Sequence, residues 1–295
     1  MKEPVFTGSG VALITPFTKE NQIDYEAFAS LLEFQIAEGT DAIIVCGTTG
    51  EASTLSRAER QQLIAFAVRQ TAGRVPVIAG SGSNSTENAI AFSQDAQQAG
   101  ADALLVVTPY YNKATQAGLQ RHYNAIANAV ALPLILYNVP SRTGVCFTAE
   151  TYKKLAQVPN IVGVKEASGN FDLLQKTRLL CPEDFYIWSG NDDDTAAICL
   201  LGGQGVISTV ANLIPGDMHR LTQLCLTDQF RQAGALQLAM KELISAVFCE
   251  VNPIPVKTAL SLMGKCQEIF RLPLCPMQPE NREKLHLAME HYGLL

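Results

Sequence analysis

A lysine at the end of an apolar run is the residue of this sequence with the clearest capacity for chemistry. Lys165 closes the run IVGVK, and Glu166 follows it. Because adjacent strand residues point to opposite faces, Glu166 is a poor ion-pair partner for this lysine. Burial disfavours the charged amine, and a neutral amine can attack a ketone. We interpret Lys165 as a nucleophile; the alternative is a structural lysine paired with a carboxylate.

A tyrosine closes the apolar run that precedes the lysine. Tyr137 ends PLILY. Neighbouring strands lie about 4.8 Å apart, so the phenol can approach the amine of Lys165 if both side chains face the same way. A phenol beside an amine can pass protons while a carbinolamine forms and loses water. The alternative interpretation of Tyr137 is an aromatic residue that covers the core.

Two further segments could hold a small carboxylate. GTTGE, at 47–51, predicts a tight turn with exposed N–H groups and two threonine hydroxyls, although many turns have this composition. Arg142 lies in NVPSRTG, where its planar guanidinium could bind a carboxylate in a fork. The alternative for Arg142 is an ordinary surface arginine.

Other catalytic chemistries lack their motifs. The four histidines have no H-E-x-x-H or comparable spacing, and no Cys-x-x-Cys pair occurs, so we expect no metal site. G-x-S-x-G, which marks a serine hydrolase, is also absent. The run Asp192-Asp193-Asp194 could suggest a cation site, but we interpret these residues as solvated side chains that favour a helix N-terminus.

Eight short apolar runs carry these residues and predict eight parallel strands buried on both faces. The runs span residues 10–16, 41–47, 75–80, 102–109, 133–140, 161–167, 185–190 and 205–209. Segments of helical periodicity separate them, at 24–38, 56–71, 84–99, 115–130, 148–157, 171–180, 191–201 and 215–227. Asp24 and Gly39 are suited to cap the first helix, and Asn84 with Glu87 resembles a capping box.

Eight successive βα units predict a (β/α)8 TIM barrel rather than a doubly wound sheet, whose phosphate-binding loops are absent. Residues 1–228 form the predicted catalytic barrel. Residues 229–295, broken by several prolines, predict a C-terminal extension of two or three helices packed on the barrel. Functional residues of such barrels lie where the strands end, as Tyr137 and Lys165 do.

Composition excludes several classes of partner. The 295 residues are 47% hydrophobic, enough for a large core, and carry a formal net charge of −6. No basic stripe suits nucleic acid, and no apolar or amphipathic segment suits a membrane. The N-terminus lacks the pattern of a signal peptide, and the eight cysteines are typical of reduced thiols. We expect a cytoplasmic protein.

Five strings together resemble the 4-hydroxy-tetrahydrodipicolinate synthase family, also called dihydrodipicolinate synthase. They are GTTGE (47–51), PYYNK (109–113), YNVPSRTG (137–144), GVKEASG (163–169) and GGQGVIS (202–208). The resemblance runs from about residue 5 into the C-terminal helices. It implies a lyase that condenses pyruvate with L-aspartate 4-semialdehyde in lysine and diaminopimelate synthesis, without a metal or organic cofactor.

The resemblance also assigns roles to residues. It implies that Lys165 forms the Schiff base with pyruvate. Tyr137, Thr48 and Tyr111 match the family's proton relay, in which the second tyrosine enters from a neighbouring subunit. Such a relay implies at least a dimer, and the family expectation is a homotetramer built from tight dimers.

Substrate binding is implied at three positions. Thr49 and the backbone of Ile207 match pyruvate-binding positions, and Arg142 matches the arginine that receives the carboxylate of the aldehyde. Related pyruvate lyases, such as N-acetylneuraminate lyase, share the lysine and the tyrosine but match PSRTG at 140–144 less well. They remain the alternative, ahead of a barrel that has lost activity and serves as a ligand sensor.

Family members often carry an allosteric lysine site near the tight subunit interface. Its positions correspond here to Ala52, Ser53, Arg57, Arg60, Asn84, Asn88 and Tyr110. Feedback-inhibited members often have histidine where Arg60 stands and glutamate where Asn88 stands. Because Arg60 repels a cation and Asn88 lacks a charge, we predict weak or absent inhibition by lysine.

Overall fold

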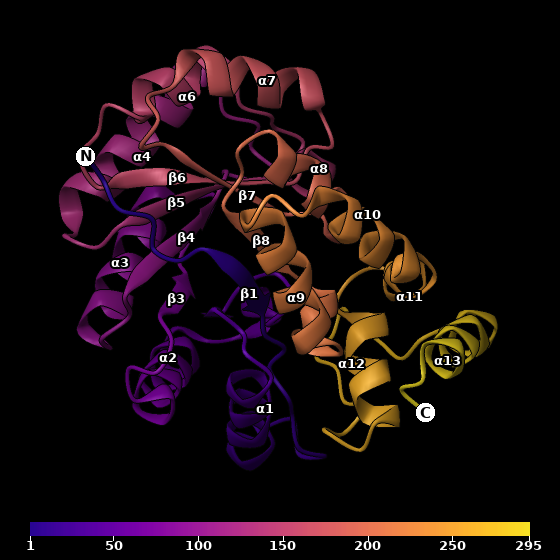
Figure 1. The fold of residues 1–295 in the computed structure, drawn as a ribbon. Coiled ribbons are helices and arrows are strands. Elements are labelled where there is room, and N and C mark those ends of the chain that lie inside the picture. Colours follow the sequence, from indigo (N-terminus) through magenta and orange to yellow (C-terminus); the bar gives the residue numbers. More distant parts are fainter.

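The structure is a computed structural model that describes residues 1–295, and its eight parallel strands close into a barrel (Figure 1). The strands are β1 (Gly8–Ala12), β2 (Ala42–Val45), β3 (Val77–Gly80), β4 (Ala103–Val107), β5 (Leu134–Asn138), β6 (Ile161–Glu166), β7 (Tyr186–Ser189) and β8 (Gly205–Ser208). Each strand pairs with its neighbours in sequence, and β1 pairs with β8. The predicted TIM barrel is confirmed.

Helices surround the barrel and continue beyond it. They are α1 (Tyr25–Ala37), α2 (Arg57–Thr71), α3 (Thr86–Gln98), α4 (Gln116–Ala129), α5 (Pro140–Thr143), α6 (Ala149–Leu155), α7 (Phe171–Leu180), α8 (Thr195–Leu200), α9 (Pro215–Leu226), α10 (Phe230–Ala239), α11 (Lys241–Val247), α12 (Ile254–Leu262) and α13 (Pro279–Tyr292). Short 3-10 turns are η1 (Ala52–Thr54), η2 (Asp192–Asp194) and η3 (Val210–Asn212). None of the helices is long and apolar enough to cross a membrane.

Several predicted elements need correction. The first strand ends at Ala12 rather than at residue 16, because the chain leaves the sheet there and the N–H of Ile14 donates to the Asn212 side chain. Ser85, not Asn84, caps α3 by accepting from the N–H of Asn88. Asp24 does cap α1 as predicted, through the N–H of Ala27.

The C-terminal extension contains four helices, α10 to α13, where two or three were predicted. A single residue, Met240, separates α10 from α11, so their combined periodicity resembles one helix. Figure 1 shows α13 outermost, with α12 between it and the barrel. Apolar residues of these helices, such as Met240 and Val256, belong to the same buried cluster as residues of the barrel wall. The domain division at residue 228 stays a prediction.

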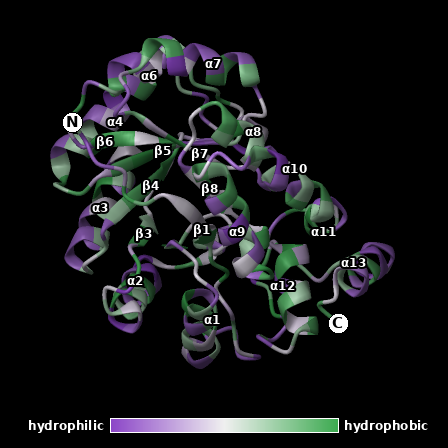
Figure 2. Cartoon of the chain, in the orientation of Figure 1, coloured by the Kyte–Doolittle hydropathy of each residue, from purple (hydrophilic) through white to green (hydrophobic).

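Two apolar layers hold the barrel together. The larger lies between the strands and the helices, and the smaller fills the interior. Figure 2 shows the strands mainly hydrophobic, whereas the helices carry both hydrophobic and hydrophilic residues. Phe6 and Trp188 stack in the interior with ring centroids 5.3 Å apart, and the indole N–H of Trp188 donates to the carbonyl of Phe6. The N-terminal segment therefore packs into the smaller core.

Close approach of β1 and β8 requires glycine. Gly205 has a φ of +137°, and a Cβ placed on it would lie 1.8 Å from the carbonyl oxygen of Gly8. We predict that Gly205→Ala lowers the free energy of unfolding by about 3 kcal/mol. An alanine there would adopt an unfavourable backbone conformation, and its Cβ would collide with the backbone of Gly8. Urea unfolding followed by circular dichroism measures this change.

Gly234 provides the matched control. It lies within α10 and has open space around it. Replacing a helix-interior glycine with alanine stabilises a helix by up to about 1 kcal/mol, so Gly234→Ala should raise the urea midpoint slightly. An unchanged midpoint for Gly205→Ala would contradict the proposed strain.

Candidate active site

Lys165 and Tyr137 meet inside the barrel. The two residues are direct partners in the register of β5 and β6, and both are at least nine-tenths buried. The Lys165 Nζ lies 4.5 Å from the centroid of the Tyr137 ring. The geometry therefore brings the amine and the phenol to one side of adjacent strands, as the end positions of the two apolar runs predict.

Glu166 points away from the lysine. Its carboxylate accepts hydrogen bonds from the Asn138 amide, the Tyr152 hydroxyl and the N–H of Ser168. Burial raises the pKa of Glu166, while these hydrogen bonds lower it. No carboxylate lies within ion-pair distance of Lys165. The alternative interpretation, a structural lysine in an ion pair, is therefore wrong.

A cavity of about 170 Å³ opens above the lysine at the carboxyl ends of the strands. Five of the predicted site residues line it: Lys165, Tyr137, Thr48, Thr49 and Arg142. They come from segments that follow or end β2, β5 and β6. The cavity can hold a small molecule in contact with an amine, a phenol, two hydroxyls and a guanidinium.

The GTTGE turn presents its threonines to this cavity. The N–H of Glu51 donates to the carbonyl of Thr48 at 3.1 Å, which closes the turn. Thr49 is almost fully buried, and its Oγ1 accepts from the Asn252 amide at 2.9 Å. Thr48 is less buried and also lines this cavity. The turn therefore offers one fixed and one accessible hydroxyl.

Arg142 stands at the mouth of the cavity. It lies on α5, a single helical turn that begins at Pro140 and was not predicted as a helix. Its side chain is exposed, and Nη2 donates to the carbonyl of Asn252 at 3.1 Å. The remaining N–H groups of the guanidinium are therefore available to a carboxylate at the entrance.

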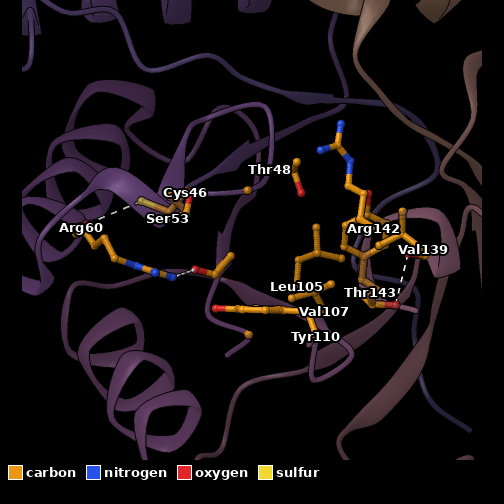
Figure 3. A pocket seen from close by; sticks show the side chains of 15 residues that line it. Cys46, Thr48, Ser53, Arg60, Leu105, Val107, Tyr110, Val139, Arg142 and Thr143 are labelled. Atoms are coloured by element: carbon orange, nitrogen blue, oxygen red, sulfur yellow. Dashed lines mark hydrogen bonds between the residues drawn. The ribbon is translucent and has the colours of Figure 1, made fainter. Parts of the chain in front are cut away.

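A second cavity of about 340 Å³ continues from the first. Thr48, Tyr137 and Arg142 line both, and the second extends to Arg60, Ser53 and Tyr110. Figure 3 shows Arg60 and Arg142 on opposite sides of this space. No aspartate or glutamate lines it.

Arg60 occupies the inner end of the second cavity. It is 8% exposed, donates to the carbonyl of Gly80 at 2.7 Å, and lies 4.1 Å from the centroid of the Phe92 ring. Burial lowers the pKa of Arg60, and the nearby Cys46, Tyr110 and Asp95 oppose this change only in part. The positive charge at this end of the cavity disfavours a cationic ligand.

Other predicted residues lie outside both cavities. Tyr111 is 90% exposed and has a φ of 73°, so a single chain does not bring it to Lys165. Ile207 is fully buried in β8. Asn84 and Asn88 line neither cavity, although Ser53 and Tyr110 line the larger one.

Two residues near the site were not foreseen. Asn252 lines the smaller cavity from the C-terminal extension, and its Oδ1 is buried without a hydrogen-bond partner. Asp192 was expected to be solvated, which is wrong: it is 2% exposed and accepts from the Ser208 hydroxyl and from the N–H groups of Thr209 and Val210. No local pattern marks Asn252, whereas Asp192 heads a run of three aspartates.

Comparisons with known proteins identify the family of the chain. The model of the Dihydrodipicolinate synthetase family matches residues 5–292. A protein of Thermoanaerobacter sp. (strain X514) named 4-hydroxy-tetrahydrodipicolinate synthase is 52% identical over 99% of this chain and 98% of its own.

Solved structures agree as well. A dihydrodipicolinate synthase from Acinetobacter baumannii, described as chloride inhibited and complexed with pyruvate, has a TM-score of 0.96 at 44% identity, over 98% of this chain and 99% of its own. A structure from Cyanidioschyzon merolae with lysine bound has a TM-score of 0.96 at 40% identity, over 99% of this chain and 100% of its own. The chain belongs to the dihydrodipicolinate synthase family.

Proposed function

We propose that the chain is a lyase that condenses pyruvate with L-aspartate 4-semialdehyde, the reaction of 4-hydroxy-tetrahydrodipicolinate synthase in lysine and diaminopimelate synthesis. The single observation that carries this proposal is the buried amine of Lys165 beside the Tyr137 ring, with no carboxylate partner, at the floor of a cavity. An amine so placed is suited to form a Schiff base with a small keto acid.

The first half of the reaction prepares a carbon nucleophile. The neutral amine of Lys165 attacks the keto carbon of pyruvate, and the carbinolamine loses water to give an iminium. The iminium accepts electron density when a C3 proton leaves, which yields an enamine. Thr49 and the backbone at Ile207 hold the pyruvate carboxylate in this proposal. Tyr137 takes and returns protons, because it lies beside the reacting nitrogen.

The second half joins the aldehyde. Arg142 binds the carboxylate of L-aspartate 4-semialdehyde at the cavity mouth, and the enamine attacks the aldehyde carbon. The amine of the second substrate then displaces Lys165 by transimination, which closes the ring and frees the enzyme. Thr48 and Tyr111 complete the proton relay with Tyr137.

The position of Tyr111 favours an oligomer. Because its side chain is almost fully exposed, it can take part in the relay only in the site of another subunit. We therefore propose a homotetramer built from tight dimers, located in the cytoplasm, in which each dimer completes its two sites by exchange of Tyr111.

Pyruvate should be trapped on Lys165. Borohydride reduces an iminium to a stable amine, so incubation with pyruvate and borohydride should add one reduced pyruvate to the peptide that contains Lys165, as found by peptide mass spectrometry. Lys165→Met should abolish the adduct. An adduct on another residue, or none, would remove the Schiff-base mechanism.

Arg142→Ala should affect the aldehyde far more than pyruvate. A hydrogen bond to a charged group contributes about 1.5–3 kcal/mol, which corresponds to a loss of roughly 10- to 100-fold in kcat/KM for L-aspartate 4-semialdehyde. The apparent KM for pyruvate and the trapping of pyruvate on Lys165 should change little. Equal losses for both substrates in steady-state assays would contradict the assigned role.

We also propose that Ser53, Asn84, Asn88 and Tyr110 mark the remnant of a lysine site that binds its ligand poorly. Arg60 lies at this position as a buried cation, and no acid lines the cavity to bind an ammonium group. L-Lysine should therefore inhibit with a constant weaker than about 1 mM, which is roughly 4 kcal/mol of binding. Steady-state assays with added L-lysine measure the constant.

A double variant provides the control for this prediction. Arg60→His with Asn88→Glu removes the permanent cation and adds a carboxylate, so it should bind lysine more tightly than the parent protein. Submillimolar inhibition of the parent protein by L-lysine would contradict the interpretation of Arg60.

A further inference from the structure

A fully buried ion pair lies behind the catalytic turn and has no part in the proposed chemistry. It joins Lys257, on α12, to Glu51, the last residue of GTTGE, and both side chains are 0% exposed. The two residues are 206 positions apart in the sequence. Two buried charges lose their hydration, so such a pair is weak evidence for stability by itself. Because Glu51 belongs to the same turn as Thr48 and Thr49, the pair is placed to affect the conformation of that turn.

The surroundings of the pair fix its geometry. The Lys257 Nζ also donates to the carbonyl of Ile269 at 3.0 Å and lies 4.3 Å from the centroid of the Phe17 ring. The second carboxylate oxygen of Glu51 accepts from the N–H of Arg271 at 3.4 Å. Burial lowers the pKa of Lys257, and the charge of Glu51 opposes this change. Both charged groups therefore have little freedom to turn.

The turn that Glu51 closes needs such a constraint. Glu51 has a φ of 52° and Cys46, just before the turn, has a φ of 54°. Neither residue is a glycine, so both ends of the turn occupy the left-handed region that ordinary side chains disfavour. Thr48 and Thr49 lie between these two strained positions. A contact that fixes the Glu51 side chain thereby fixes the backbone of the threonines.

The same part of the extension reaches the site a second time. Asn252, just before α12, donates from its amide to the Thr49 Oγ1 and accepts from Arg142 through its carbonyl. Lys257 and Asn252 therefore contact the same short turn, one at its last residue and the other at its centre. Lys257 lies in the first part of α12, and Asn252 lies just before that helix begins.

We propose that Lys257 is a positioning residue that acts through Glu51 to hold the Thr48–Thr49 turn in its catalytic geometry. This inference rests on the proposed function, in which Thr48 passes protons and Thr49 binds pyruvate. The C-terminal extension is then part of the active site, because it supplies the cation without which the turn relaxes.

Paired apolar variants separate positioning from stability. Lys257→Met and Glu51→Met each leave one buried charge without a partner, and each single variant should unfold at a lower temperature than the parent. The double variant removes both charges and should recover most of the unfolding temperature. If the pair positions the turn, the double variant keeps a kcat at least about tenfold below the parent, with a raised KM for pyruvate.

An isosteric variant guards against a failure to fold. Glu51→Gln keeps the shape of the side chain and one oxygen acceptor for Lys257, removes the charge, and loses the acceptor for the weak hydrogen bond from the N–H of Arg271. It should also lower kcat, while borohydride still traps pyruvate on Lys165. Recovery of the parental kcat by the double variant, or a parental kcat in Glu51→Gln, would overturn the proposal.

The control uses another ion pair of the same extension. Arg282 and Glu268 are partly exposed and lie outside both cavities. The double variant Arg282→Met with Glu268→Met should leave kcat and the KM for pyruvate unchanged. The parent protein distinguishes the two proposals: if it fails to condense the substrates or to form the Lys165 adduct, the proposed function is wrong, whatever the variants do.

Discussion

The register of β5 against β6 is the constraint on which the active site depends. It places Tyr137 beside Lys165 on the inner side of the barrel, where the amine lies over an aromatic ring and forms no ion pair. A shift of β6 by one residue would turn Lys165 outward and bring Glu166 inward, because side chains alternate along a strand. The hydrogen bonds of Glu166 to Asn138 and Tyr152 oppose such a shift.

Closure of the barrel turns this local pairing into a site. The carboxyl ends of eight strands meet at one rim, so turns that are distant in sequence reach the same cavity. The turn after β2 brings two threonine hydroxyls, and the turn after β5 brings Arg142. At the end of β8, Asp192 accepts from the backbone N–H groups of Thr209 and Val210 and fixes that part of the rim.

Periodicity predicted the barrel well because its strands are buried on both faces and its helices on one. The predicted ends of strands and helices were wrong where side-chain contacts override the hydrophobic periodicity. The first strand ends early because Asn212 binds the backbone of Ile14. The helix α5 was not predicted because four residues are too few for a periodic signal, and α10 and α11 resemble one helix because a single residue separates them.

The residues of the candidate site could be predicted only where the neighbouring sequence indicates their position in the fold. Lys165 and Tyr137 end apolar strands, so the strand pattern alone indicates that they meet. Nothing in the sequence near Asn252 indicates that its amide reaches Thr49, because that contact spans 203 residues and depends on where the extension packs. Tyr111 is exposed and does not line the cavity of its own chain, so no local pattern could test the proposal that it acts in a neighbouring subunit.

The C-terminal extension contacts the turn after β2 through Lys257 and Asn252. A strained turn between Cys46 and Glu51 does not hold its own shape, because both ends occupy unfavourable backbone conformations. Backbone hydrogen bonds from the N–H groups of Glu51 and Ala52 close the turn, but they leave the Glu51 side chain to be held by residues outside it. Just after β1, the Thr15 hydroxyl donates to the carbonyl of Gly50, and α12 supplies the partner of the Glu51 carboxylate from the other end of the sequence through Lys257. In this proposal, the ion pair connects the packing of the C-terminal extension to the geometry of the catalytic turn.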